Sequence, residues 1–226
     1  MGNILVIAAH PDDEVLGVGA TINKLSNDND VYILIVTEGC SSQYKGHDVE
    51  KIIADKKGMA KKAARILGAK DVIFGDLPDM KLDTVPHIDV NKVIEDAVDK
   101  IKPEIVFTHH FGDVNLDHQM VYRSTLVATR PSVGSCVKKI YTYEVLSATE
   151  WQSSQTSHIF VPNTYVEVDS KMLEVKKQAL KAYSIELRQY PHTRSEEAID
   201  NLAAFRGQSV GVCAAEAFCL LREVVK

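Results

Sequence analysis

The sequence has few cysteines, no concentration of basic residues and no long hydrophobic run. Its four cysteines are scattered, without a C-x-x-C pair, so we expect neither a disulfide scaffold nor a thiolate metal site. The formal charge of -5 comes without a stripe of Lys and Arg, which disfavours nucleic acid as a partner. The chemistry must therefore be sought in other residue types.

The apolar run at residues 3–9 is too short to cross a membrane, and no basic segment precedes it as in a signal peptide. We therefore expect no membrane insertion and a cytoplasmic location. A chain of 226 residues, 45% hydrophobic and 25% charged, fits a single domain over 1–226. The sequence does not decide between a monomer and a homo-oligomer.

Short apolar runs alternate with amphipathic segments over the first two thirds of the chain. We expect helices at 48–67, ended by Gly68, and at 87–101, among strands at 3–9, 31–37, 71–75, 104–108 and 139–143. This alternation predicts an α/β fold, a Rossmann-like, doubly wound, mainly parallel sheet with helices on both faces. In the expected strand order 3-2-1-4-5, the first and fourth strands are neighbours.

The pattern is weaker toward the C-terminus. We expect a helix from after His118 to about 129, an irregular segment at 147–168, and helices at 171–183 and 196–206. Residues 215–225 fit a strand or a helix equally well. His47, His87 and His158 are expected at the surface.

A cluster of polar residues, His10 to Glu14, directly follows the first predicted strand. Ligands bind at this edge of open α/β sheets. An imidazole beside two carboxylates allows Asp13 to bind a metal ion while Asp12 accepts a proton from water. The alternative is a helix start whose acids face free N–H groups, but that alternative leaves His10 unexplained.

A second cluster, residues 108–118, follows the fourth predicted strand and holds three of the eight histidines. If the first and fourth strands are neighbours, both clusters meet at the switch point of the sheet, and His118 completes a site of two histidines and a carboxylate. The alternative is a loop in which Asn115 or Asp117 caps a helix. His109 and His110 could each orient a ligand or simply end the strand.

These residues resemble the LmbE/PIG-L family of zinc-dependent N-acetylglucosaminyl de-N-acetylases. The resemblance extends over nearly the whole chain, and its first block is highly specific. It is carried by residues 9–14, Pro78-Asp79, Asp117-His118, 147–151, Arg194-Ser195, Arg206-Gly207 and 215–218.

The resemblance implies one zinc ion per chain, held by His10, Asp13 and His118, with another divalent transition metal as the alternative. It also implies that Asp12 is the general base and that Asp79 lies near the substrate.

The chain departs from the family where many members have a histidine proposed to stabilise the oxyanion, because Asn115 stands there. An asparagine can donate a hydrogen bond but cannot act as an imidazolium acid. His192 is the other candidate for this role.

Two further residues, His110 and Arg194, are assigned to the neighbourhood of the substrate. His110 is a candidate contact, and Arg194 could bind a phosphate or carboxylate, with a surface salt bridge as the alternative. Trp151 and Tyr143 are expected to be packing residues rather than sugar platforms.

The predicted function is removal of the N-acetyl group from an amino sugar or its conjugate by a metal-dependent hydrolase, giving acetate and a free amine. Two other interpretations stay open. One is a magnesium-dependent phosphoryl-transfer enzyme, because magnesium prefers carboxylate oxygens. The other is a non-catalytic module that binds sugars.

Overall fold

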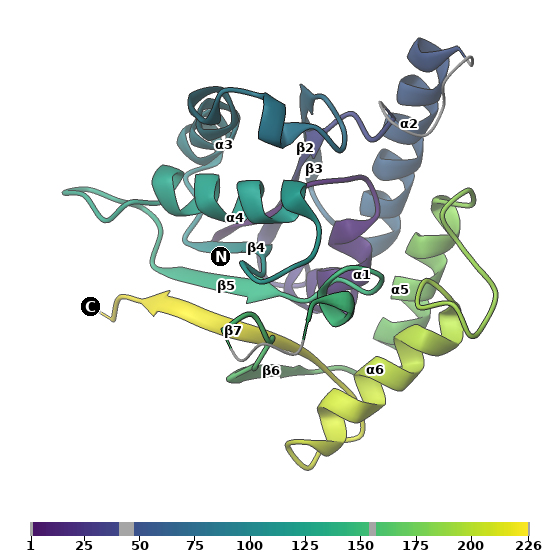
Figure 1. Ribbon diagram of the computed structural model, residues 1–226. Coiled ribbons are helices and arrows are strands. Elements are labelled where there is room, and N and C mark those ends of the chain that lie inside the picture. Colours follow the sequence, from purple (N-terminus) through teal and green to yellow (C-terminus); the bar gives the residue numbers. More distant parts are fainter. Residues whose placement is uncertain (1, 41–47, 154–156, 226) are drawn as a thin grey trace.

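A seven-stranded sheet with the order β3-β2-β1-β4-β5-β7-β6 runs through the protein (Figure 1). The structure is a computed structural model that describes residues 2–40, 48–153 and 157–225. The first five strands are parallel in the predicted order, whereas β7 is antiparallel to both neighbours. The strands are β1 (Asn3–Ala8), β2 (Asp30–Thr37), β3 (Asp71–Leu77), β4 (Ile105–His109), β5 (Lys139–Tyr143), β6 (Thr164–Glu167) and β7 (Ala215–Glu223).

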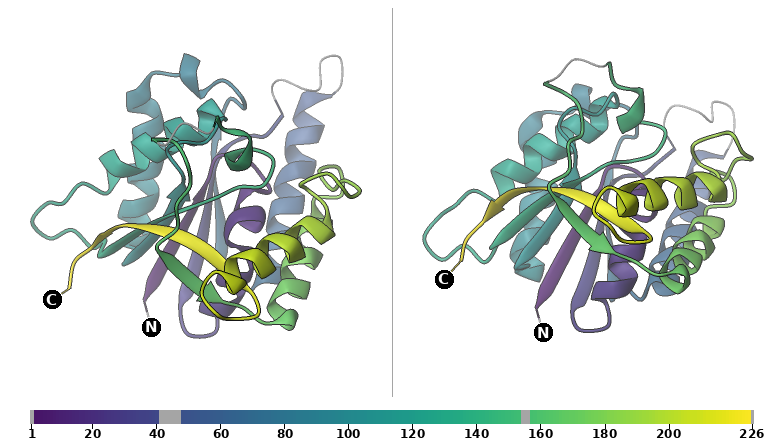
Figure 2. Two further views of the ribbon diagram at one scale, coloured as in Figure 1. Left: turned by 60° about the horizontal axis from the view of Figure 1, so that its bottom comes forward. Right: turned by 90° about the horizontal axis from the view of Figure 1, so that it is seen from below.

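Helices cover both faces of the sheet, as expected (Figure 2). One face carries α1 (Asp13–Leu25), α2 (Val49–Leu67), α5 (Ser170–Ala182) and α6 (Glu196–Gln208), and the other carries α3 (His87–Ile101) and α4 (Leu116–Ala128). Strand β1 supplies both cores because its side chains alternate. Ile4 and Val6 pack toward α1 and α2, whereas Leu5 and Ile7 pack toward α3 and α4.

Three expectations change in the second half of the chain. Helix α4 begins at Leu116 instead of after His118, so His118 lies in its first turn. The segment expected to be irregular contains a 3-10 turn, η2 (Thr149–Trp151), and the strand β6. Residues 215–223 are a strand. His87 and His158 are exposed, as predicted, and His47 lies outside the described residues.

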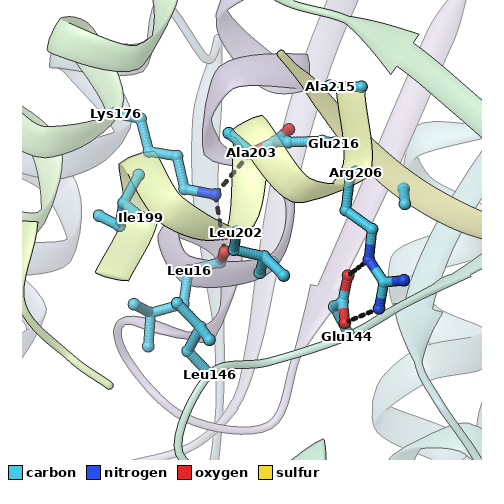
Figure 3. A pocket seen from close by; sticks show the side chains of 12 residues that line it. Leu16, Glu144, Leu146, Lys176, Ile199, Leu202, Ala203, Arg206, Ala215 and Glu216 are labelled. Carbon is cyan, nitrogen blue, oxygen red and sulfur yellow. Dashed lines mark hydrogen bonds and ion pairs between the residues drawn. The ribbon is translucent and has the colours of Figure 1, made fainter. Parts of the chain in front are cut away.

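A buried ion pair between Lys176 of α5 and Glu216 of β7 is hydrogen-bonded to the backbone of α1 (Figure 3). Lys176 Nζ donates to Glu216 Oε1 at 2.6 Å and to the carbonyl oxygen of Leu16 at 2.7 Å. The Glu216 carboxylate accepts from the backbone N–H groups of Ala20, at 3.1 Å, and Thr21, at 2.7 Å. The pair therefore fixes the helix that follows the first polar cluster.

Tyr143 packs directly against α1, which confirms its predicted packing role. It is fully buried, and its hydroxyl donates to the carbonyl oxygen of Ile7 at 2.7 Å. A Cβ atom at Gly17 would lie 2.2 Å from the Tyr143 ring, so any larger residue would push β5 and α1 apart.

Among the described helices, none combines the length and the apolar character that a bilayer crossing requires.

Candidate active site

The two polar clusters meet at the carboxyl ends of β1 and β4, which are neighbours in the sheet. His10 follows β1, Asp13 opens α1, and His118 lies in the first turn of α4. Because α1 and α4 cover opposite faces of the sheet, the chain diverges here and leaves an opening at the switch point. The predicted meeting of the clusters is confirmed.

Three potential ligand atoms converge at this point. His10 Nδ1 lies 3.1 Å from Asp13 Oδ2 and 3.2 Å from His118 Nε2, and the third distance, from His118 Nε2 to Asp13 Oδ2, is 3.2 Å. A tetrahedral zinc ion with bonds of about 2.0–2.1 Å holds its ligand atoms roughly 3.3 Å apart. The donor set and its spacing therefore fit a single cation.

Each of the two imidazoles has a carboxylate on its other nitrogen. His10 Nε2 lies 3.1 Å from Asp117 Oδ2, and His118 Nδ1 lies 3.0 Å from Asp113 Oδ2. Metal-binding histidines usually have such a partner, which fixes the ring and raises the basicity of the ligand nitrogen. The sequence pattern gives neither Asp113 nor Asp117 a role beside the imidazoles, although both lie in the second cluster.

Asp117 also ties the cluster to the loop after β3. Its carboxylate accepts from the backbone N–H groups of Met80, at 2.7 Å, and Leu82, at 3.0 Å. The same loop carries Asp79, whose Oδ1 lies 3.5 Å from His10 Nε2. Burial raises the pKa of Asp79.

The cluster binds protons strongly in the absence of a cation. Burial by itself lowers the pKa of His118, but Asp13 and Asp113 outweigh burial and raise it to about 9. The pKa of His10 is likewise raised, against burial, by Asp13 and Asp117. Burial opposes ionisation of Asp13, yet the two imidazoles hold its pKa well below the ordinary value. A bound cation would therefore displace protons from the imidazoles.

Asp12 stands beside the ligands in an unusual conformation. Its backbone is left-handed, with φ of 113°, and its side chain is only 2% exposed and caps no backbone group of α1. Non-glycine residues adopt such a conformation at an energetic cost, which is found mainly at functional sites. Burial raises the pKa of Asp12 to about 7, although the positive charge of Arg194 opposes this shift. Helix capping alone therefore does not explain Asp12.

Glu14 and Tyr183 hold the backbone at Asp12. Glu14 Oε2 accepts from the Asp12 N–H at 3.1 Å, and Glu14 Oε1 accepts from the Tyr183 hydroxyl at 2.6 Å. Burial raises the pKa of Glu14 to about 8. Tyr183 comes from the end of α5, 169 positions away in the sequence, so no local pattern could have indicated this contact.

Arg194 approaches Asp12 from the C-terminal third of the chain. Its Nη1 lies 3.3 Å from Asp12 Oδ2 and 3.0 Å from Glu186 Oε2. Glu186 also accepts from Lys56 Nζ at 3.0 Å. The salt bridge predicted as an alternative for Arg194 exists, but it lies next to the candidate base and not at the outer surface.

A cavity of about 550 Å³ opens beside the cluster, and Asn115, Asp117, His192 and Arg194 line it. Asn115 caps α4, because its Oδ1 accepts from the Asp117 N–H at 2.9 Å, while its Nδ2 faces the Met80 sulfur at 3.6 Å. His192 is exposed, and its Nδ1 accepts from the Arg194 N–H at 3.0 Å. Both oxyanion candidates therefore border the cavity.

His109 and His110 have separate surroundings. His109 stacks on His118 with ring centroids 3.9 Å apart, and its Nε2 accepts from the Ala9 N–H at 2.8 Å. Burial holds the pKa of His109 well below its ordinary value, so a neutral ring supports the ligand. His110 instead contacts the carbonyl oxygen of His158 at 3.1 Å and is absent from the cavity wall. This geometry gives no support to a substrate contact by His110.

The family model and the relatives that this chain matches are named as deacetylases. Residues 5–129 match the family model "PIG-L: GlcNAc-PI de-N-acetylase". The "Uncharacterized deacetylase YaiS" of Escherichia coli is 32% identical over 190 residues, covering 80% of this chain and 89% of that protein. The "Diacetylchitobiose deacetylase" of Thermococcus kodakarensis is 33% identical over 109 residues, covering 46% of this chain and 39% of that protein.

Solved structures share the fold. The N,N'-diacetylchitobiose deacetylase from Pyrococcus horikoshii superposes with a TM-score of 0.79 at 21% identity, covering 98% of this chain and 84% of that chain. At this level of identity the likeness establishes the fold alone.

Proposed function

Because this chain belongs to the PIG-L family, we propose that it is a metal-dependent hydrolase that removes the N-acetyl group from an amino sugar, giving acetate and a free amine. One observation carries the proposal: His10, Asp13 and His118 converge, and a carboxylate lies behind each imidazole. The proposed cation is zinc, one per chain. Two imidazole nitrogens favour a transition metal over magnesium, which disfavours the phosphoryl-transfer alternative.

Asp12 provides the base in the proposed reaction. When bound, a divalent cation acts as a Lewis acid toward the amide carbonyl and makes water more acidic. The Asp12 carboxylate accepts the proton of the attacking water, while Arg194, 3.3 Å from Asp12 Oδ2, holds the carboxylate in place. The same carboxyl group can then return the proton to the leaving amine. Asn115 Nδ2 and His192 Nε2 are the donors available for the charge that develops on the carbonyl oxygen.

Two variants test the proposal, with bound metal and acetate release from a panel of N-acetylated sugars as the measurements. Asp12→Asn should keep the metal and lose activity by about 10²–10⁴-fold, because it removes proton transfer. His118→Ala should lose both, because it removes a ligand. Asp96→Asn, in an exposed ion pair on α3, is the matched control. Near-normal activity in Asp12→Asn would contradict the assignment of Asp12 as the general base. Wild-type protein that binds no metal and turns over none of the sugars would contradict the proposed enzymatic function.

A further inference from the structure

The cavity beside the metal ligands has a polar floor, and both polar and large apolar side chains line its exposed part. Asp117 and Arg194 line the floor near His10 and Asp12. Four large apolar side chains on the cavity wall are exposed to solvent, namely Met80, Val114, Leu116 and Trp151. Exposed apolar groups gathered at one polar site usually contact a ligand.

Trp151 is the largest of these side chains and is 58% exposed. It does not pack in the core, so its predicted packing role is wrong. Among the residues that the structure describes, the other exposed aromatic side chains, such as Phe205 on α6, are absent from this cavity wall. The position of Trp151 at the cavity therefore needs its own explanation.

The η2 turn that ends in Trp151 is tied to the metal ligands. Thr149 Oγ1 accepts from the Val145 N–H at 2.8 Å and donates to Asp113 Oδ2 at 2.8 Å. The same Asp113 oxygen lies 3.0 Å from His118 Nδ1. Only one carboxylate and one hydroxyl separate the tryptophan turn from a ligand of the cation.

The same turn is also tied to the candidate base. Ser147 Oγ accepts from Arg194 Nε at 2.7 Å, and Arg194 Nη1 lies 3.3 Å from Asp12. The Ser147 N–H donates to Glu150 Oε1 at 2.6 Å, and the Ser147 backbone is left-handed, with φ of 70°. The turn is therefore anchored on both sides, and this anchoring places Trp151 at the cavity.

We propose that Trp151 is a stacking platform for a second ring of the substrate, which makes the substrate an N-acetylated amino sugar joined to a further ring and not a free monosaccharide. This inference rests on the proposed function. The acetamido group of the reacting sugar meets the polar floor, and the next ring lies on the indole. The ring can be a pyranose, through its C–H face, or an aryl group, because both present a flat apolar surface.

Kinetics with matched glycosides test the platform. We compare the methyl glycoside of N-acetylglucosamine, its phenyl glycoside and N,N'-diacetylchitobiose, using acetate release. Trp151→Ala should lower kcat/KM for a two-ring substrate by about tenfold and leave the methyl glycoside unchanged. Trp151→Phe should keep most of the wild-type kcat/KM for the two-ring substrate. Phe205→Ala, which removes an exposed aromatic ring elsewhere, is the control and should change none of the values. Loss with the disaccharide alone assigns the platform to a sugar, and loss with the phenyl glycoside alone assigns it to an aryl group.

Fluorescence gives a readout that is independent of turnover, because Trp151 is the only tryptophan of the chain. In zinc-loaded Asp12→Asn, a two-ring ligand should shift the emission to shorter wavelength, whereas the methyl glycoside should not. If Trp151→Ala and the wild type turn over all three substrates with the same relative kcat/KM, the stacking role of Trp151 is overturned, whereas the proposed deacetylase function stands. Absence of turnover by the metal-loaded wild type overturns the proposed function and, with it, the platform.

Discussion

Asp113 and Asp117 decide how firmly the two imidazoles are held for a cation. Each carboxylate lies on the outer nitrogen of a candidate ligand, at 3.0 Å from His118 and at 3.1 Å from His10. Asp113→Asn should weaken zinc binding by about 10–100-fold, because the amide is a poorer acceptor and leaves His118 less basic. Competition with a chelating dye measures this affinity.

A control variant separates the two contacts of Asp113, one with the candidate ligand His118 and one with the η2 turn. Asp113 also accepts from Thr149 at 2.8 Å, and Thr149→Val removes this contact while leaving the carboxylate beside His118. Its zinc affinity should stay close to that of the wild type. Unchanged affinity in Asp113→Asn would contradict a supporting role for Asp113.

At this scale, the sequence predicts the residues that are concentrated in short segments. His10, Asp13 and His118 lie in two polar clusters that follow predicted strands, and the structure brings them together. Asp113 and Asp117 were visible in the same segment, but Asx turn chemistry explained them equally well. The contacts of Tyr183 and Glu186 with the site depend on tertiary packing across the molecule, which no local pattern encodes.

Helix α1 follows the first polar cluster. About one turn later, the Lys176–Glu216 pair is hydrogen-bonded to the helix backbone at Leu16 (Figure 3). Lys176→Met should destabilise the fold by about 3–5 kcal/mol, because it leaves the Glu216 carboxylate buried without its cation. Urea unfolding measures the loss. Lys92→Met, which removes an exposed pair with Asp96, should leave the free energy of unfolding almost unchanged. Equal effects of the two variants would show that the buried pair has no special role.

At the scale of elements, the central strands are predictable because they are continuous apolar runs. Strands β1 to β5 and their order follow from these runs and from the helices between them. The β6 strand has only four residues, mostly half-buried, so it shows neither a run nor a clear alternation. In β7 the first four residues are buried and later ones alternate irregularly, which left a strand and a helix equally plausible from the sequence.

The cation would join parts of the chain that lie on opposite faces of the sheet. Asp13 opens α1 on one face, and His118 lies in the first turn of α4 on the other. At free zinc of about 100 times the Kd, binding should stabilise the protein by about 2.7 kcal/mol. In a chain of this size, that corresponds to a rise in Tm of about 5–10 °C. Thermal unfolding with and without a chelator measures it.

The variant His118→Ala should unfold at the same temperature with or without the chelator. A chelator effect of equal size in this variant would point to a cation bound elsewhere in the molecule.

Sequence separation gives the parts of the site an order of assembly. The candidate ligands come from segments joined through β1 and β4, which are about 100 residues apart. The groups that surround Asp12 and Glu14 include Arg194 and Tyr183, and the latter is 169 positions from Glu14. Contacts that close longer loops form more slowly. During refolding, the protein would therefore capture its cation before it could hydrolyse a substrate, and the two events would follow different time courses.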